Sequence, residues 1–384
     1  MGIELSARVD AVPPSGIRKF FELAEERDDV ISLGVGEPDF ATPWRARTAA
    51  IDSLERGRTS YTANRGMLEL REAISDHVER EYDLEYSADE EILVTAGASE
   101  AVDLAFRAFV DPGDTVAVAE PAYVSYAPGV TFAGGEVLGV PTRERDEFRL
   151  TREALEASGA SDAEVLVLCF PNNPTGATMR EEHLEPVAAF AREHDLTVIS
   201  DEIYAALQYE HDHTSIATLP GMRERTVVVN GFSKAYAMTG LRLGYVMGPS
   251  EAVMGMNRIH QYAMLSAPTT AQYAALEALE SCDDAVDEMV AAYDRRRNFL
   301  LSRFDDIGMD CFRAKGAFYA FPEVPGERTG DEFAEALLKE EGVAVVPGSV
   351  FGDGGDGHLR VSYATGMQAL REATDRIERF VAEH

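Results

Sequence analysis

The feature that most constrains the fold is an alternation of short apolar segments with longer segments whose apolar residues recur at helical spacing. The short segments are apolar on both faces and end in turn residues, as expected for strands buried in a mostly parallel sheet with helices on each side. The sequence therefore predicts an α/β core built on a seven-stranded sheet. The expected strands are EILVTAG, TVAVAEP, EVLGVP, VLVLCFPNNPTG, LTVISDE, TVVVNGFSK and LGYVMG.

Helical periodicity dominates the C-terminal part, where the expected strands KGAFYAFP, GVAVVP and HLRVSYA lie among helices. We therefore predict a large domain over residues 45–282 and a smaller α+β domain over residues 283–384. Residues 1–44 are expected to pack on the small domain. The sequence contains no internal repeat and no Pro/Ser linker, so the two domains are expected to pack closely.

Charge and hydropathy exclude several classes of function. No apolar stretch approaches the ~18 residues that a membrane helix requires. The 68 acidic and 35 basic residues give a net charge of -33, whose field repels phosphate backbones and argues against a nucleic-acid partner. Because the acidic residues are dispersed and lysine is rare, we expect a solvated acidic surface suited to a cytoplasm of high salt.

Cysteine spacing and short motifs exclude further classes. Cys169, Cys282 and Cys311 are far apart and odd in number, so neither a disulfide framework nor a zinc site is expected, and we predict no metal. The N-terminus lacks a secretory pattern, which favours the cytosol. GVGEPD fails the dinucleotide-binding spacing, and FGDGGDG fails that of a calcium loop.

The four lysines can be compared by elimination. Lys19 and Lys339 belong to amphipathic helical segments, and Lys315 precedes a strand as a surface charge would. Lys234 instead follows the apolar segment TVVVNGF, at a strand end where ligands of open α/β sheets bind. A desolvated amine with a lowered pKa forms an imine with an aldehyde cofactor, so Lys234 is the expected nucleophile.

Other strand ends supply partners for such a cofactor. Asp201 closes LTVIS and either forms a local salt bridge or holds a proton on a heterocyclic nitrogen, which pyridoxal phosphate requires to act as an electron sink. Tyr204 can reach the phenolic oxygen of the same ring. Tyr123 is either a core aromatic residue or a platform stacked on that ring.

A phosphate site is expected where TAGASEAVDLAF begins a helix. Gly97, Ala98 and Ser99 would present free backbone amides and the positive end of the helix dipole. Arg242 could add bidentate bonds, and Ser233 a hydroxyl group.

Ten motifs occur in order along nearly the whole chain: SLGVGEPDF, YTANRGMLELREAI, VTAGASEA, EPAYVSYAP, PNNPTGA, ISDEIY, NGFSKAYAMTGLRLGY, KGAFYAFP, VVPGSVFG and HLRVSYAT. With them the sequence resembles the class I and II aminotransferases among the fold-type I pyridoxal-phosphate enzymes. The likeness is nearest to the archaeal and bacterial branch that contains aspartate and aromatic amino-acid aminotransferases.

The resemblance implies that pyridoxal 5'-phosphate is bound through Lys234, with Asp201 at its ring nitrogen and Asn173 and Tyr204 at its phenolic oxygen. Asn173 would also contact the substrate. Arg360 would bind the α-carboxylate, with the backbone amide of Gly36 beside it.

Two further residues take roles by the same resemblance. Ile17 would close over the substrate when the small domain moves. Tyr61 would reach the phosphate of the neighbouring subunit, which implies a two-fold symmetric homodimer.

Three positions depart from the family pattern. Position 231 is Gly where many relatives have a phosphate-binding Ser or Thr, so that contact is lost or taken by Ser233. Leu241 stands where tryptophan is frequent. Ser99 stands where some aspartate-preferring relatives carry lysine, which weakens the case for a dicarboxylate substrate.

The implied activity is a ping-pong transfer of the amino group from an aromatic or aspartate-type L-amino acid to a 2-oxo acid, most often 2-oxoglutarate in this family. Arg18 or Arg258 could meet a distal carboxylate, although no motif assigns either. Alternatives are an alanine-type transaminase, or a carbon-sulfur lyase, synthase or decarboxylase on the same scaffold. A cofactor-binding transcriptional regulator would need a helix-turn-helix domain, for which the N-terminus has no room.

Overall fold

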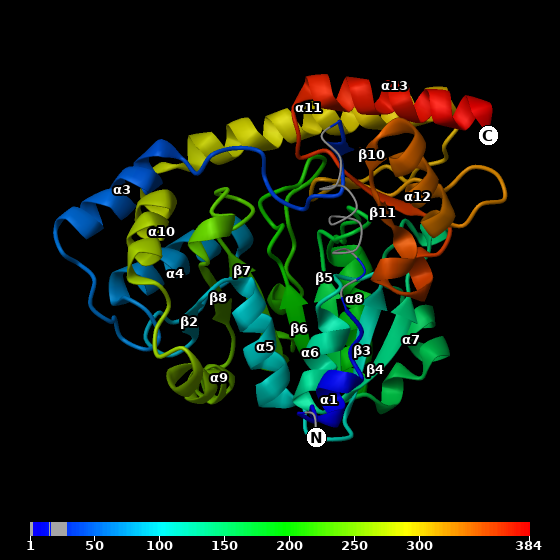
Figure 1. Ribbon diagram of the computed structural model, residues 1–384. Helices are drawn as coiled ribbons and strands as arrows, with labels where there is room; N and C mark the ends of the chain where they lie inside the picture. The colour runs from blue at the N-terminus through cyan, green and yellow to red at the C-terminus, as the bar shows by residue number, and fades with distance from the viewer. Residues whose placement is uncertain (1–2, 15, 17–28) are drawn as a thin grey trace.

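The computed structural model describes residues 3–14, 16 and 29–384, so Ile17 lies outside the described residues. Its centre is a seven-stranded sheet with helices on both faces (Figure 1). This arrangement confirms the α/β fold that the alternating pattern predicts. The strands are β2 (Ile92–Thr95), β3 (Thr115–Glu120), β4 (Glu136–Pro141), β5 (Val165–Cys169), β6 (Thr197–Asp201), β7 (Thr226–Gly231) and β8 (Gly244–Met247).

The strands lie in the order β2-β8-β7-β6-β5-β3-β4. Only β8 runs antiparallel to its neighbours, β2 and β7, and the remaining pairs are parallel. Every residue of β5 and β7 is buried, because helices cover both faces of the sheet. This explains why these segments are uniformly apolar rather than alternating.

Alternate residues of one strand enter different apolar clusters. In β5, Leu166 packs with α7 and α8 on one face, whereas Val167 packs with α5, α6 and α9 on the other. None of the helices in the described part of the chain has the length and apolarity to cross a bilayer. The helices around this sheet are α3 (Trp44–Glu55), α4 (Leu68–Tyr82), α5 (Ala98–Phe109), α6 (Tyr126–Ala133), α7 (Arg152–Ser158), α8 (Glu181–Glu193), α9 (Ser250–Ala263) and α10 (Thr269–Ser281).

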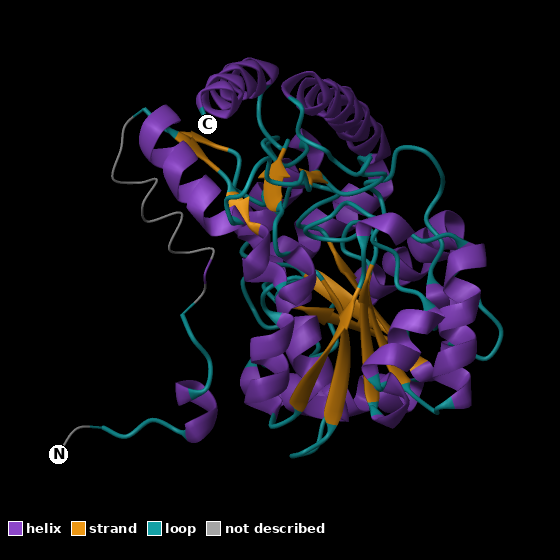
Figure 2. Cartoon of the chain, turned by 90° about the vertical axis from the view of Figure 1, so that its right-hand side faces the viewer, coloured by secondary structure: helices purple, strands orange, loops and turns teal. Residues whose placement is uncertain are grey.

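The C-terminal part forms a smaller α+β layer, in which α11 and α13 lie across the top of the molecule (Figures 1 and 2). Its three-stranded antiparallel sheet has the order β11-β12-β9. The domain boundaries at residues 44/45 and 282/283 stay predictions. The elements are α11 (Asp283–Ile307), β9 (Tyr319–Ala320), α12 (Gly330–Glu341), β10 (Val343–Ala344), β11 (Val346–Pro347), β12 (Leu359–Ser362) and α13 (Met367–Glu383).

The N-terminal segment contacts both layers. Its strand β1 (Ile31–Ser32) pairs in parallel with β10, a pairing that the sequence analysis does not anticipate. The short helix α1 (Ala7–Asp10) lies by α6 instead, where Arg8 Nη1 donates to the carbonyl oxygen of Phe132 at 2.9 Å.

A close approach of two strands explains one departure from the family pattern. Gly231 of β7 and Gly244 of β8 are register partners. A Cβ added to Gly231 would lie 2.8 Å from the Cα of Gly244 and 3.1 Å from the carbonyl oxygen of Leu243. A serine here would therefore push β8 away before its hydroxyl could bind anything.

We expect Gly231→Ala to destabilise the protein by about 1–3 kcal/mol, because the added methyl group overpacks the strand pair. The matched control is Gly255→Ala in α9, where an added Cβ meets nothing within 4 Å. The control should be neutral or stabilising by roughly 0.5–1 kcal/mol, since alanine favours helix. Thermal unfolding at one fixed protein concentration measures both; equal unfolding temperatures for the two variants would contradict the steric argument.

Candidate active site

A cavity of about 340 Å³ lies beyond the carboxyl ends of β5, β6 and β7. Most of the side chains singled out from the sequence line it, although they come from segments far apart in the chain. Tyr61 does not line it and is 80% exposed. The predicted residues that line the cavity are Gly36, Ala98, Ser99, Tyr123, Asn173, Asp201, Tyr204, Ser233, Lys234, Arg242 and Arg360.

Lys234 follows β7 and reaches the cavity from the end of that strand. Its Nζ donates to the carbonyl oxygen of Gly36 at 2.6 Å and lies 5.8 Å and 5.7 Å from the ring centres of Tyr204 and Phe318. Enclosure by protein lowers the pKa of the amine from 10.5 to about 8, although Glu37 partly opposes the shift. About a tenth of this amine is therefore neutral, and nucleophilic, at pH 7, far more than for a lysine of ordinary pKa.

Asp201 ends β6, and its carboxylate is buried beneath the same cavity. One oxygen accepts from the hydroxyl of Tyr126 at 2.7 Å, and the other accepts from the backbone N–H of Ile203 at 3.1 Å. Burial raises the pKa of Asp201 to about 6, while the two hydrogen bonds act in the opposite direction. A buried carboxylate in this position is suited to a cationic N–H group of a ligand.

Tyr126 and Tyr319 belong to the site but were not predicted. Tyr126 is the second tyrosine of EPAYVSY, and its bond to Asp201 orients that carboxylate. Tyr319, in KGAFYAFP, lies 2.9 Å from Tyr204 between hydroxyl oxygens. Both occur within motifs that carry the family resemblance, and that is the signal that could have found them.

Arg360 projects from β12 and is buried, with 3% of its surface exposed. Its Nη1 donates to Oδ1 of Asn173 at 3.0 Å and its Nη2 to the carbonyl oxygen of Gly34 at 2.6 Å, while its Nε has no partner. Among the residues that the structure describes, no carboxylate forms an ion pair with it. A buried guanidinium held only by neutral acceptors is a binding site for an anion such as a carboxylate.

A second anion site lies at the start of α5. Gly97 has φ +86°, and a Cβ added there would lie 2.7 Å from Nη2 of Arg242. Arg242 has φ +54° and donates through Nη1 to the carbonyl oxygen of Thr239 at 3.0 Å. The guanidinium is thus held against the helix N-terminus, where backbone amides and the helix dipole also favour a phosphate. Ser99 and Ser233 line the same end of the cavity.

The arrangement provides an amine of lowered pKa, two guanidinium groups and a buried carboxylate around one cavity. The cavity therefore fits a flat, anionic ligand with a basic ring nitrogen, together with a carboxylate substrate. The chemistry of these donors, and the absence of a carboxylate partner for Arg360 among the described residues, match pyridoxal phosphate and an amino acid.

Comparisons with known proteins identify the family of the chain. Residues 28–377 match the family of class I and II aminotransferases. The chain is 45% identical to an aspartate aminotransferase of Pyrococcus abyssi (99% of this chain, 98% of that protein) and 42% identical to aromatic-amino-acid aminotransferase 2 of Thermococcus litoralis (99% and 98%). It is also similar to the structure of Thermus thermophilus aspartate aminotransferase with maleate, at a TM-score of 0.93 and 40% identity over 98% of this chain and all of the other. The chain therefore belongs to the class I and II aminotransferases and is a transaminase of amino acids.

Proposed function

We propose that this transaminase binds pyridoxal 5'-phosphate in the cavity between β5, β6 and β7 and α5, with the roles that the resemblance implies. The observation that carries the proposal is the amine of Lys234, whose pKa is lowered to about 8 and whose one hydrogen-bond partner is a neutral carbonyl oxygen. Members of the matching family use this cofactor. When bound, the cofactor withdraws electrons from the Cα of the attached amino acid.

Different residues around the cavity would bind different parts of the cofactor. Arg242 and the first amides of α5, with Ser99 and Ser233, would bind the phosphate. The carboxylate of Asp201 would keep a proton on the ring nitrogen, oriented by its bond from Tyr126. Asn173 and Tyr204 would donate to the phenolic oxygen, and Tyr123 would stack on the ring.

The substrate would be held at the opposite end. Arg360 would exchange its neutral acceptors for the α-carboxylate, beside the backbone amide of Gly36. Lys234, once released from the cofactor, would take the proton from Cα and return it on the other side of the carbon-nitrogen bond, acting as a single general base and acid. The same steps in reverse would load the amino group on a 2-oxo acid, which gives ping-pong kinetics.

The donor is proposed to be an aromatic or acidic L-amino acid, and 2-oxoglutarate the acceptor. Tyr319 also lines the cavity, and its ring centre is 4.7 Å from the guanidinium carbon of Arg360, where it would meet the side chain of an aromatic donor. Arg242 and Arg360 are the only arginines among the described residues that line it, and both already have an anion to bind, while Arg258 on α9 is exposed. The acidic donor is therefore proposed on the likeness to the relatives and not on a described arginine. Arg18 lies outside the described residues. The two relatives named for aspartate and aromatic amino acids support the same pair of donors.

The proposed assembly is a homodimer in which Tyr61 reaches the phosphate of the partner. Tyr61 is 80% exposed, and several large apolar side chains on other segments are exposed as well. The loop that carries Tyr61 is bound to the segment after α9, where Asn64 donates to the carbonyl oxygen of Leu265 at 2.6 Å. Large exposed apolar side chains on α3, at the start of α4 and at the end of α9 are Trp44, Ile51, Leu54, Leu68, Tyr262, Met264 and Leu265.

The net charge of -33 supports a cytoplasm of high salt as the working environment, because salt screens repulsion among the dispersed surface carboxylates.

We expect Lys234→Ala to lower the rate of amino transfer by about 10³-fold or more, since the general base is lost. Lys234→Arg should lose as much, because a guanidinium stays charged and cannot abstract a proton. Borohydride treatment of the parent should attach the cofactor to the peptide that contains residue 234, as read by mass spectrometry. An Ala variant with the parent's rate, or a label on another lysine, would refute the assignment.

Asp201→Asn should raise the stability of the cofactor-free protein and lower the transaminase activity. Folding raises the pKa of Asp201 from 3.8 to about 6, so its ionised form destabilises the folded, cofactor-free protein above pH 6, and this cost vanishes as the pH falls toward 4. We therefore expect the variant to be more stable by about 1–3 kcal/mol at neutral pH and by much less near pH 4. Urea unfolding of both cofactor-free proteins measures the difference. A less stable variant at neutral pH would contradict the desolvation argument, and a variant with undiminished activity would contradict the role at the ring nitrogen.

A panel of donors with 2-oxoglutarate tests the proposed specificity. We expect kcat/KM for phenylalanine or tyrosine, and for aspartate, to exceed that for alanine and the branched-chain amino acids by about tenfold or more, because one well-placed contact is worth about that factor. Each assay measures both the 2-oxo acid released from the donor and the glutamate formed from 2-oxoglutarate. High activity with alanine or branched-chain donors alone would overturn the substrate assignment, and release of ammonia, carbon dioxide or a thiol in place of glutamate would overturn the reaction.

A further inference from the structure

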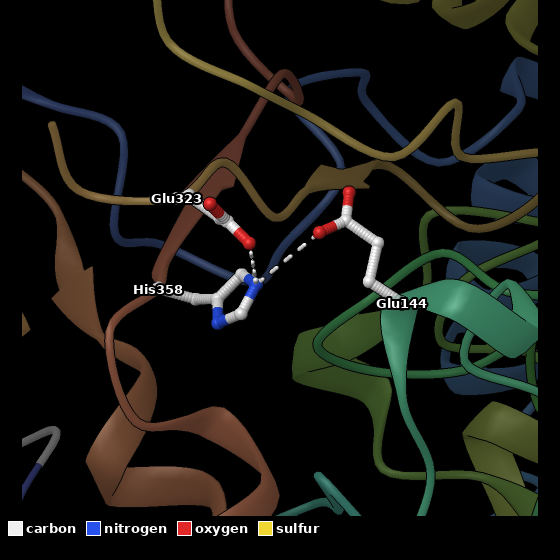
Figure 3. A group of neighbouring side chains, drawn as sticks. All are labelled: Glu144, Glu323 and His358. Atoms are coloured by element: carbon white, nitrogen blue, oxygen red, sulfur yellow. Dashed lines mark ion pairs between the residues drawn. The ribbon is translucent and has the colours of Figure 1, made fainter.

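A second group of ionisable side chains lies outside the cavity, where the central sheet meets the three-stranded sheet. Glu144 follows β4 in a short 3₁₀ helix, Glu323 follows β9, and His358 precedes β12. Nε2 of His358 is 3.9 Å from a carboxylate oxygen of Glu144 and 3.9 Å from one of Glu323 (Figure 3). Their ligand atoms all lie within 4.8 Å of one another, and no other such trio of His, Cys, Asp or Glu is found among residues 3–14, 16 and 29–384.

The imidazole of His358 is held so that one nitrogen faces the two carboxylates. Its Nδ1 is 3.1 Å from the carbonyl oxygen of Asp356, to which Nδ1–H donates. The ring stacks on Phe321 at 4.8 Å and meets the ring of Phe148 edge-on at 5.6 Å. When the ring is neutral and Nδ1 carries the proton, Nε2 has a lone pair that faces the two carboxylates. Metal-ligating histidines have this tautomer and orientation.

That nitrogen has no hydrogen-bond partner among the residues that the structure describes. Nε2 of His358 is itself buried, and the side chain is 12% exposed. Within the described part of the chain, neither Glu144 nor Glu323 forms an ion pair with a lysine or an arginine. Three electron-pair donors thus converge on one point without a cation from the protein.

We propose that Glu144, Glu323 and His358 bind a divalent metal ion of the zinc class at the junction of the two sheets. An imidazole ligand favours zinc and its transition-metal neighbours over magnesium and calcium. Zinc sites with three protein ligands keep a fourth position for water. Ligand atoms of a tetrahedral zinc ion lie about 3.4 Å apart, so the two separations of 3.9 Å between His358 and the carboxylates would need to close by roughly half an ångström.

The site has a structural consequence, because its ligands come from two layers of the fold. Glu144 belongs to the β4–α7 connection of the central sheet, whereas Glu323 and His358 border the three-stranded sheet. His358 is two residues before Arg360, so a bound ion would restrain the strand that carries the proposed carboxylate-binding arginine. Binding to the folded chain alone would also raise its stability in proportion to the logarithm of metal concentration.

Calorimetric titration of the full-length, cofactor-loaded protein tests this, after treatment with a chelator and in buffer of high potassium chloride that screens the acidic surface. We expect one zinc ion per chain with a Kd in the micromolar range or below, and binding of magnesium and calcium at least about 100-fold weaker. The unfolding temperature should rise with zinc. No heat of zinc binding up to millimolar concentration, or equal affinity for magnesium, would overturn the site.

Substitutions locate the bound ion. His358→Gln and Glu144→Gln should each weaken zinc binding by about 10–100-fold or more. The matched control is His183→Gln. Nε2 of His183 is also 3.9 Å from a carboxylate oxygen, that of Glu182, but it has no second carboxylate partner within the described chain and lies 2.7 Å from Nη1 of Arg149. Glu323→Gln provides a second test that spares the core, since that side chain is 51% exposed. Zinc affinity that is unchanged in the Glu323 and His358 variants, or that falls equally in the His183 control, would refute the assignment.

Discussion

The structure depends on two cations, the buried Arg360 and the half-buried Lys234, that are held by neutral oxygens instead of carboxylates. Lys234 donates to the carbonyl oxygen of Gly36, and Arg360 donates to that of Gly34 and to Asn173. A backbone carbonyl offers partial negative charge, which is enough to tolerate a cation in the cavity but leaves its charge uncompensated. The free energy gained when an anionic ligand replaces these acceptors is what we infer to drive binding here.

Both carbonyl acceptors belong to one segment that is anchored in two layers of the fold. Leu33 accepts from the backbone N–H of Ser362 at 2.7 Å, next to the β1–β10 pairing. Farther along, Asp39 receives two bonds from Arg296 of α11, at 2.7 and 2.9 Å. Thr42 then donates to the carbonyl oxygen of Ala237, close to Lys234. The segment thereby couples the lysine of the central sheet to the arginine of the small sheet.

Much of the fold and site was predictable, and the misses have a common physical origin. Lys234 and Asp201 could be identified because each ends a segment that is apolar on both faces, and parallel strands present such ends at one edge. Tyr126 begins α6 in the β3–β4 connection, and only the placing of β3, β5 and β6 side by side in the sheet brings it to Asp201. Strand β1 is two residues long, too short for any period, and its partner Val343 is set by tertiary packing. Glu144, Glu323 and His358 likewise meet from three connections with no shared spacing.

The buried carboxylate under the cavity is supported by a second one directly after it in the sequence. Glu202 is 1% exposed and accepts from the hydroxyls of Ser200 and Ser215 at 2.8 and 2.6 Å, while Nε2 of His213 lies 2.8 Å from its other oxygen. A charge satisfied this fully fixes the backbone on which it sits. Because Asp201 precedes Glu202 on that backbone, its carboxylate cannot turn away from the cavity to regain water. The desolvation that raises the pKa of Asp201 is therefore built into the strand end, and a cationic ring nitrogen is the kind of ligand that would relieve it.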